Sequence, residues 1–544
     1  MQDSRNMILA VALCLAVLFG WGRFAEYMGW VTPPAQQTAQ QQPAQQQPAP
    51  VVEDRPVSPA FVPAPGQDIQ VNTPLYDAVI HSGGGVLRSF SLRLYGTALA
   101  DLARPAPRVN MVSPQAAAMA PLGLVVNGQP SWSTGKWASA PDTGDIALEA
   151  DGRATLRLSG EVDNLRIERE LVFSADSYLI HETVRLGNPG AQARTARLIY
   201  TAAADASNST SDNYDGMRIA WDKDGSLAEE SSVKTLESTG VRDSGRIYWA
   251  GAMSTYFLSA VVPDSPDGGM TVKGRLQQNV YRVALEEPEI NLAPGEEKTC
   301  SVSYWLGPKE RARLQSVSPE LAKSIDLGIF SLIAKGLLWL LQIFHSWTHN
   351  WGIAIILLTV LIKAAFWPLT ARSYSSMEKM KKLQPMMTGL REKYKDDKER
   401  MNKEVMALYK TYGVNPASGC VPILIQLPVF FGLYQALLTA IELRHAPFIV
   451  HLPFTDIVWL ADLSSKDPYY ITPVIMGLTM FLQQKMSPPA ADPTQQKVMM
   501  FLPLIFTVLF LSFPSGLVIY WLVNNILSIA QQWLMIRKNS AARA

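Results

Sequence analysis

The sequence has few of the residues and motifs on which most enzyme chemistry depends. Its 544 residues include three cysteines, Cys14, Cys300 and Cys420, which stand far apart and in no CxxC or metal-ligand spacing. We therefore expect neither a disulfide framework nor a metal site. The P-loop pattern GxxxxGK[ST] is absent, and a net charge of +1 gives no support to nucleic-acid binding. These absences predict a protein that is not an enzyme, carries no cofactor and binds no nucleic acid directly.

The chain is long enough for two or more folding units, and its slightly positive mean hydropathy fits a protein that is half soluble and half membrane. Met7–Gly22 is a continuous apolar run. A cleaved signal peptide is one interpretation, but Arg23, Phe24 and Glu26 follow where small residues would mark a cleavage site. We favour an uncleaved anchor over residues 1–30, with its N-terminus in the cytoplasm. Residues 31–66, rich in Pro and Gln, are typical of a linker.

Residues 67–308 show a period of two, as in Leu165–Leu171, with turn signals such as Pro294-Gly295 between the alternating stretches. No long helical period interrupts them, so a large all-β sandwich is predicted. His81 and His181 are its only histidines. His181 and Glu182 are neighbours in one strand and point to opposite faces. We expect structural roles for both histidines.

Trp351–Ala371 is long enough to cross a bilayer, but it contains Lys363. A lysine within a transmembrane helix is costly and usually faces a bundle interior or a wet cavity. Thr359 lies one turn earlier on the same face. The alternative is a lysine that extends along its own stem to the headgroups. Both interpretations remain open at this stage.

Hydrophobic runs and basic loops predict a polytopic α-helical membrane protein with a large β domain on the side of the membrane away from the cytoplasm. Ile325–Trp347 could span the membrane, but we prefer an amphipathic helix in the interface, because a span there would reverse the orientation set by the basic loops. With that choice both termini are cytoplasmic. The predicted parts are an N-terminal anchor (1–30), a linker (31–66), a β domain (67–308), a connector with the interfacial helix (309–348), transmembrane helices at 349–371, 417–443, 469–486, 498–513 and 514–536, a basic helical hairpin (372–416), a periplasmic loop (444–468), a cytoplasmic loop (487–497) and a basic tail (537–544).

The predicted hairpin holds eleven Lys and Arg residues against six Asp and Glu, which places it in the cytoplasm. Asp396-Asp397 stands where its turn would fall. One face carries Met377, Met380 and Met387, and Lys381 and Lys382 lie on other faces. Methionines in this pattern either pack the hairpin or offer an adaptable surface to partners of varied sequence.

Polar residues recur in two further spans. Gln426 lies between two prolines of the 417–443 span. In the last span Trp521, Asn525 and Ser528 share one face, and Asn524 lies on the neighbouring face. Such residues either hydrogen-bond between helices or line a polar site.

Several long motifs carry a family resemblance: WPLTARSYSSMEKMKKLQP, ALYKTYGVNPASGCVPILIQLPVFFGLY, DPYYITPVIMGLTMF, QQKMSPP, FPSGLVIYWLVNN and LAPGEEKTCSVSYWLGPK. Together they resemble the YidC/Oxa/Alb family of membrane protein insertases, in its Gram-negative form. The resemblance implies five core helices around a hydrophilic groove that is open to cytoplasm and lipid. It also implies a periplasmic β super-sandwich and location in the bacterial inner membrane. Its implied partners are nascent membrane proteins, the lipid bilayer, the Sec translocon and the ribosome.

The resemblance assigns the groove cation to Lys363, where the family more often has arginine. Thr359, Gln426, Trp521 and Asn524 are the other groove residues expected, and Trp521 stands where the family often has tyrosine. The short tail after Arg537 offers little for ribosome docking. A secondary transporter and a membrane-anchored periplasmic sugar protein are the rival classes. Paired broken helices would favour the first, and a polar constellation within 67–308 would favour the second.

Overall fold

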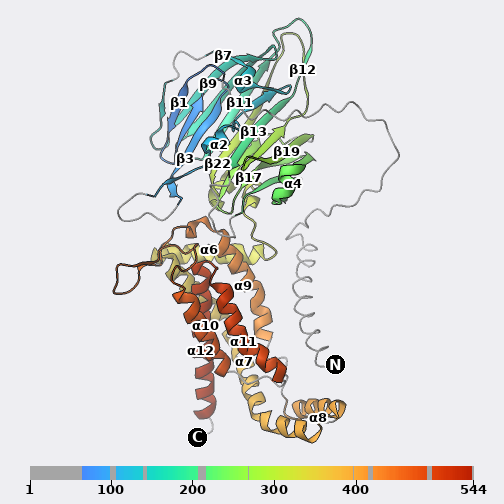
Figure 1. The fold of residues 1–544 in the computed structure, drawn as a ribbon, viewed down its shortest axis with the longest axis vertical. Coiled ribbons are helices and arrows are strands. Elements are labelled where there is room, and N and C mark those ends of the chain that lie inside the picture. The colour runs from blue at the N-terminus through green and yellow to red at the C-terminus, as the bar shows by residue number, and fades with distance from the viewer. Residues whose placement is uncertain are drawn as a thin grey trace, which may run out of the picture. The chain divides into compact units, whose positions relative to one another are not determined.

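The computed structural model describes residues 64–97, 106–138, 144–205, 216–266, 269–395, 397–413, 421–486 and 493–541. The predicted anchor and nearly all of the predicted linker lie outside these residues. The chain separates into two compact units, one within Thr32–Ile325 and one that contains Asp326–Ala544. We call their described parts the β domain and the helical unit, and Figure 1 labels the elements of each.

The β domain consists of three main sheets and a two-stranded ribbon. The nine-stranded sheet has the order β15 (Ser226–Glu230), β14 (Arg218–Lys223), β17 (Ile247–Met253), β18 (Phe257–Pro263), β22 (Glu297–Pro308), β11 (Leu179–Gly187), β10 (Leu165–Ser174), β9 (Arg153–Val162), β7 (Lys136–Ala138). The six-stranded sheet has the order β16 (Val241–Gly245), β19 (Met270–Gln277), β20 (Val280–Glu286), β13 (Leu198–Asp205), β5 (Leu124–Val126), β6 (Gln129–Pro130). The five-stranded sheet has the order β4 (Arg108–Asn110), β3 (Val86–Gly96), β2 (Tyr76–His81), β1 (Asp68–Asn72), β8 (Ile146–Ala147), and β12 (Arg194–Ala196) pairs with β21 (Ile290–Leu292).

The β domain also contains five short helices: α2 (Pro114–Ala117), α3 (Ser131–Thr134), α4 (Val233–Ser238), α5 (Arg311–Val317) and the 3-10 helix η2 (Leu321–Ser324). Helix α2 contacts strands β3, β13 and β20, and α4 contacts β19. The two larger sheets contact each other through β13 and β20 of one and β17 and β18 of the other. A mostly β domain agrees with the alternating sequence pattern.

One of the inward-facing residues of β10 is charged. Alternate residues of this strand are buried, as a strand with one core face requires, and Arg169 occupies one of those inward positions. Its guanidinium hydrogen-bonds the carboxylate of Glu182 and the carbonyl of Gly84, and its Nη2 donates to the Leu122 carbonyl at 2.7 Å. Both charged side chains are completely buried. The core of the β domain is therefore closed around an ion pair whose hydrogen bonds are made inside the protein.

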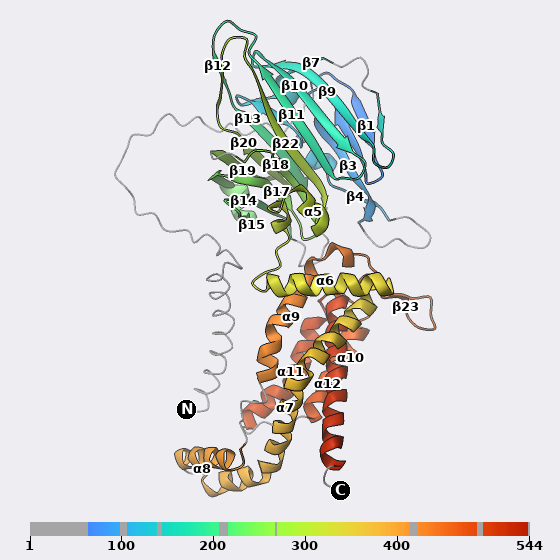
Figure 2. The ribbon, with the colours of Figure 1, turned by 180° about the vertical axis from the view of Figure 1, so that it is seen from behind.

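The helical unit begins with α6 and ends with α12. Its elements are α6 (Ser331–Thr348), α7 (Trp351–Lys393), α8 (Lys398–Thr411), α9 (Val421–Thr439), η4 (Ile441–Leu443), β23 (Ile449–His451), β24 (Val458–Leu460), α10 (Ile471–Met486), α11 (Pro493–Phe510) and α12 (Ser515–Ala541). Figure 2 shows α6 lying across one end of this unit, while α7 and α12 run along it. This is the arrangement expected of an amphipathic helix at a bundle's end.

Helix α7 differs from the sequence prediction in its length. The pattern suggested one helix ending at residue 371 and a separate hairpin from residue 372, punctuated by Pro385. Instead α7 continues for 43 residues, with Pro368 and Pro385 inside it. A proline removes only one backbone donor, and the Lys- and Met-rich residues around Pro385 are good helix formers. The helical hairpin is thus the second half of α7 together with α8, and Asp397 caps the start of α8.

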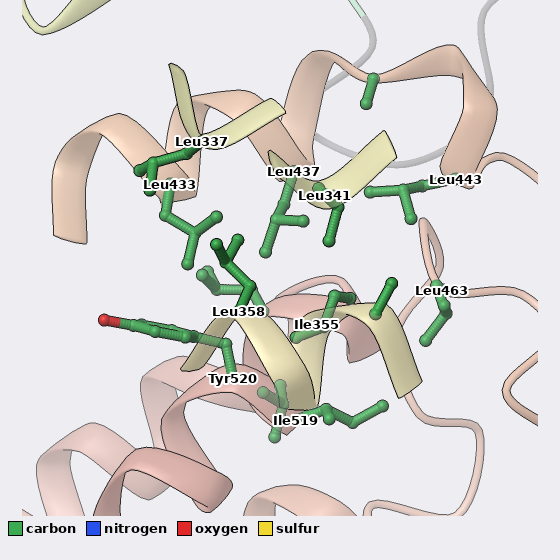
Figure 3. Packing of buried hydrophobic residues seen from close by; sticks show 14 of the residues in the cluster. Leu337, Leu341, Ile355, Leu358, Leu433, Leu437, Leu443, Leu463, Ile519 and Tyr520 are labelled. Atoms are coloured by element: carbon green, nitrogen blue, oxygen red, sulfur yellow. The ribbon is translucent and has the colours of Figure 1, made fainter. Parts of the chain in front are cut away.

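A leucine-rich core joins α6, α7, α9 and α12 (Figure 3). The labelled side chains that meet there are Leu337 and Leu341 of α6, Ile355 and Leu358 of α7, Leu433 and Leu437 of α9, and Ile519 and Tyr520 of α12, with Leu443 and Leu463 at the edge. Within the described residues, one helical stretch, Trp351–Leu390, is long and apolar enough to cross a membrane, and Ile425–Thr439 and Met500–Phe510 are shorter apolar helices.

Candidate functional site

The polar site of the helical unit lies where α7 packs against α12. Lys363 of α7 is only 8% exposed. Its Nζ donates a hydrogen bond to Ser528 Oγ of α12 at 2.7 Å, and that hydroxyl donates to the Asn524 carbonyl one turn earlier. The ammonium group therefore points between two helices rather than along its own helix toward an end.

A second bridge continues this contact two turns further along α7. Gln531 Nε2 of α12 donates to Thr370 Oγ1 at 2.7 Å, and both side chains are buried. Thr370 follows Lys363 by seven residues and Gln531 follows Ser528 by three, so each pair shares a helix face. We call Lys363, Thr370, Ser528 and Gln531 the polar seam. Thr370 and Gln531 are not among the residues predicted from the sequence, although their spacing from Lys363 and Ser528 places each pair on one helix face.

The polar seam leaves charge and hydrogen-bonding capacity unused. An ammonium group has three donors, and Ser528 is the one hydrogen-bond partner that the described residues supply to Lys363. No carboxylate among those residues forms an ion pair with it. Gln532, next to the seam, is 5% exposed, and its Oε1 accepts no hydrogen bond from the described part of the chain. Buried charges in folded proteins are normally paired, so the unpaired ammonium of Lys363 is what leaves this seam chemically incomplete.

The structure places the other predicted groove residues apart from Lys363 Nζ. Thr359 is buried, but its hydroxyl donates to the Ile355 carbonyl of its own helix at 2.7 Å. Gln426 lies half-buried on α9, and Asn524 meets the seam through its backbone carbonyl. Trp521 belongs to an aromatic cluster with Phe430, Phe506 and Phe510, with ring centroids 4.8 to 5.9 Å apart.

The hairpin residues divide into a packed set and an exposed set. Met387 is buried with Leu383 and Tyr409, and the Tyr409 hydroxyl lies 3.4 Å from its sulfur. Met380 packs against this cluster, and Met377 is half-buried. Lys381 and Lys382 are exposed. Met386 and Met406, which are not among the predicted contact residues, are the exposed methionines of the described hairpin residues.

The β domain brings its histidines into ordinary structural contacts. His81 contacts the Asp68 carboxylate through Nδ1 at 2.8 Å and the Ala64 carbonyl through Nε2 at 3.0 Å. His181 Nδ1 lies 3.1 Å from Ser303 Oγ. Among the described residues, no group of three or more His, Cys, Asp or Glu side chains is placed to hold a metal ion.

Comparisons with known proteins agree with this two-part organisation. The family described as "60Kd inner membrane protein" matches residues 343–542, and the family described as "YidC periplasmic domain" matches residues 68–340. A membrane protein insertase YidC of Nitratidesulfovibrio vulgaris (strain DSM 19637 / Miyazaki F) is 54% identical over 546 residues, which cover 99% of this chain and 100% of the relative. Another from Lawsonia intracellularis is 50% identical over 541 residues, with the same coverage. A crystal structure of an active YidC insertase with its first transmembrane domain resolved is 18% identical and covers 87% of this chain and 93% of that chain, with a TM-score of 0.36.

These matches define the class as inner-membrane proteins with a mostly β periplasmic domain. The chain belongs to the YidC family of membrane protein insertases. This membership confirms the resemblance in the sequence motifs. The function named for these relatives is not an enzymatic reaction, in agreement with the prediction that the chain is not an enzyme.

Proposed function

We propose that this protein inserts integral membrane proteins into the inner membrane, alone or beside the Sec translocon. In this proposal the polar seam receives the polar segment of the substrate. The observation that carries the proposal is Lys363, a buried cation whose one hydrogen-bond partner among the described residues is Ser528. A cation that is shielded from bulk water and incompletely paired by the protein is an attractive partner for a substrate carboxylate, because charges interact more strongly there than in bulk water.

The position of Lys363 along α7 suits this role. It lies twelve residues after Trp351, about 18 Å along the helix, and nine residues before Arg372. A polar group at such depth shortens the dry distance that a substrate's charged segment must cross, since each unsatisfied group in hydrocarbon costs several kcal/mol. Gln426 and Asn524 line the approach to the seam in this proposal, and Thr359 and Trp521 form its apolar boundary. The substrate's apolar helix then leaves along the outer surface of the helices.

That outer surface suits a helical unit that crosses the membrane more than once, and with the predicted anchor the proposal counts six spans. Large apolar side chains stay exposed along three helices of the helical unit: Leu478 and Leu482 on α10, Leu504, Ile505, Val508 and Leu509 on α11, and Ile526 and Leu534 on α12. Exposed apolar surface of this extent is unusual on a water-soluble protein and suits contact with lipid. The basic hairpin and the basic tail then lie in the cytoplasm with both termini.

The cytoplasmic hairpin offers the first contact for substrates or ribosomes. Lys381 and Lys382 present charge on its exposed side. Met377 and Met380 stay partly accessible, and the exposed Met386 and Met406 enlarge the adaptable apolar surface. Met387 supports this surface from within by packing the hairpin.

The charge of Lys363 provides the direct test of the proposal. Lys363→Glu should reduce insertion of a substrate with an acidic translocated segment by about tenfold or more, whereas Lys363→Arg should insert it at nearly the normal rate. The measurement is protease protection of the translocated segment in vesicles, for two versions of one substrate that differ only in acidic or neutral residues. Lys485→Glu makes the same charge change at an exposed position of α10 and serves as the matched control. Equal insertion of both substrate versions by Lys363→Glu would refute the electrostatic role of Lys363.

A further inference from the structure

A small β-hairpin projects from the helical unit between η4 and α10. Its strands β23 and β24 pair through Ile449 with Leu460 and through His451 with Val458. At the tip, the Leu452 carbonyl accepts a hydrogen bond from the Thr455 amide at 3.0 Å. Pro453 follows Leu452, and Phe454 comes next with a φ of +66°. These are the features of a type II turn, in which glycine or asparagine normally occupies the position of Phe454.

Phe454 is an unfavourable residue for the backbone at this position. A left-handed φ brings the Cβ of an L-residue too close to the neighbouring carbonyl oxygen, a clash that glycine avoids. The Phe454 side chain gains nothing in return from the rest of the described chain, because it is fully exposed at 106%. A strained conformation with no internal compensation points to a role outside the fold.

Exposed apolar residues occur on both faces of the hairpin, although Leu460 at its base is buried. Val450 and Val458 point to opposite faces of the ribbon, because Val458 pairs with His451 and neighbours along a strand alternate. Both valines are more than 40% exposed, and so is Ile457 beside the tip. A protein partner docked on one face would leave the other valine in water. A fluid apolar medium covers both faces and the tip together.

The base of the hairpin is held firmly at the end of the helical unit where α7 begins. Asn350, the residue that caps α7, donates through Nδ2 to the Phe448 carbonyl at 3.0 Å. Asp467 accepts a hydrogen bond from Trp459 Nε1 at 2.9 Å and another from the Thr472 amide at the start of α10 at 2.7 Å. Figure 2 shows the hairpin, labelled β23, extending outward at the level of α6. A rigid base and an exposed apolar tip suit an anchor.

We propose that the hairpin of residues 449–460 is a lipid anchor that places Phe454 in the outer leaflet of the membrane. The inference rests on the proposed function, which places the surrounding helices in the bilayer. Aromatic side chains are favoured at membrane interfaces, and exposed aromatics at the same end of the unit, Trp347 of α6 and Tyr469 before α10, extend the same belt. Asp456 beside the tip keeps the insertion shallow, since a carboxylate stays with the headgroups. The anchor fixes the connection between α9 and α10 at the membrane surface.

The test uses the full-length protein in vesicles that contain a phospholipid with a photoactivatable diazirine in its acyl chain. After illumination, lipid adducts are mapped on peptides by mass spectrometry. We expect adducts on residues 449–460 and a decrease of about tenfold in Phe454→Gly, the factor that one aromatic side chain contributes to partitioning from water. Phe454→Trp should keep them. The peptide around Leu478 of α10 is the internal reference for lipid exposure in every variant.

The outcomes separate the anchor from the placement of the helical unit. Glycine suits the turn, so Phe454→Gly should fold normally and keep its adducts at Leu478. Adducts at Leu478 but none on residues 449–460 would overturn the anchor and leave the proposed function standing. Adducts on the hairpin that persist in Phe454→Gly would also overturn it, as would protection of the hairpin by a bound protein in native membranes. No adducts at either place would contradict the membrane placement itself.

Discussion

Arg169 of the β domain and Lys363 of the helical unit are both buried cations, but their surroundings differ. Arg169 has the Glu182 carboxylate and backbone carbonyls around it, so its charge and its donors are used within the domain. Lys363 has the hydroxyl of Ser528, and no described carboxylate neutralises it. Burying a charge is costly unless it is paired and hydrogen-bonded. The first cation is therefore paired with a carboxylate inside its domain, whereas the second is kept at a cost to the unit that contains it.

The two buried cations, Arg169 and Lys363, therefore have different roles. Removing one member of a completed buried pair leaves the other uncompensated, so Arg169 is required by the fold. Removing a cation that has no countercharge relieves a desolvation cost, so the fold does not require Lys363. Its retention makes sense if a substrate supplies the missing partner for part of the working cycle.

The largest effect expected from this comparison is on the stability of the β domain. Arg169→Met leaves Glu182 buried without its partner and should lower the free energy of unfolding by about 3–5 kcal/mol. Arg166→Met, in the same strand, removes an exposed arginine whose Nη2 lies 2.8 Å from Glu168. An exposed pair of this kind contributes about 0–1 kcal/mol, so this control should be nearly silent. Hydrogen exchange of β10 and β11 peptides in the full-length protein measures both effects. Equal protection in the two variants would mean that Arg169 is not part of the core's support.

Replacing the buried cation of the helical unit by methionine should change the free energy of unfolding in the opposite direction. Lys363→Met removes an unpaired cation, so stability should stay unchanged or rise by about 1 kcal/mol or more. Insertion of substrates with acidic segments should fall in the same variant. Hydrogen exchange of α7 and α12 peptides reports the stability, and protease protection reports the insertion. A loss of several kcal/mol would show that Lys363 is structural in the manner of Arg169.

A smaller effect distinguishes a wet seam from a dry one. Ser528→Ala removes the hydroxyl that contacts Lys363. If water reaches the seam, it replaces that hydrogen bond, and the cost should stay below about 0.5 kcal/mol. A sealed seam should lose about 1–3 kcal/mol instead.

Thr201→Val is the matched control for Ser528→Ala in the closed β domain. Thr201 is 1% exposed, and its Oγ1 donates to the Ala120 carbonyl at 2.6 Å. This variant should show the full cost of about 1–3 kcal/mol, because water does not replace the bond. Equal losses at the two positions, measured by hydrogen exchange, would contradict a hydrated seam.

The residues of these two sites show how far the sequence could lead. Strand alternation predicts which residues of β10 face inward, but it does not predict what Arg169 will bind. Its partners Glu182 and Gly84 belong to other segments of the chain and are brought to it only by the folded sheet. On α12 the helical period left two candidate faces. The period groups Trp521, Asn525 and Ser528 on one of these faces, but in the structure their partners differ: Ser528 contacts Lys363, Asn525 contacts Thr479 of α10, and Trp521 packs against aromatic rings. Helix rotation depends on packing against neighbours, which periodicity alone does not encode.

The last prediction concerns the reactivity of the Cys300 thiol in the folded β domain, which we expect to be very low. Burial, followed by the neighbouring Glu287 carboxylate, raises the pKa of the Cys300 thiol to about 12. At pH 8 such a thiol holds roughly three orders of magnitude less thiolate than an ordinary cysteine, and the thiolate is the reactive form. In a variant with Cys14→Ser and Cys420→Ser, iodoacetamide should modify Cys300 only very slowly at pH 8 in the native state and rapidly in denaturant. The native rate should continue to rise about tenfold per pH unit from 8 to 10, because titration of this thiol lies above that range. An ordinary thiol levels off near pH 9, and that behaviour at Cys300 would mean that the interior around Glu287 is open to water.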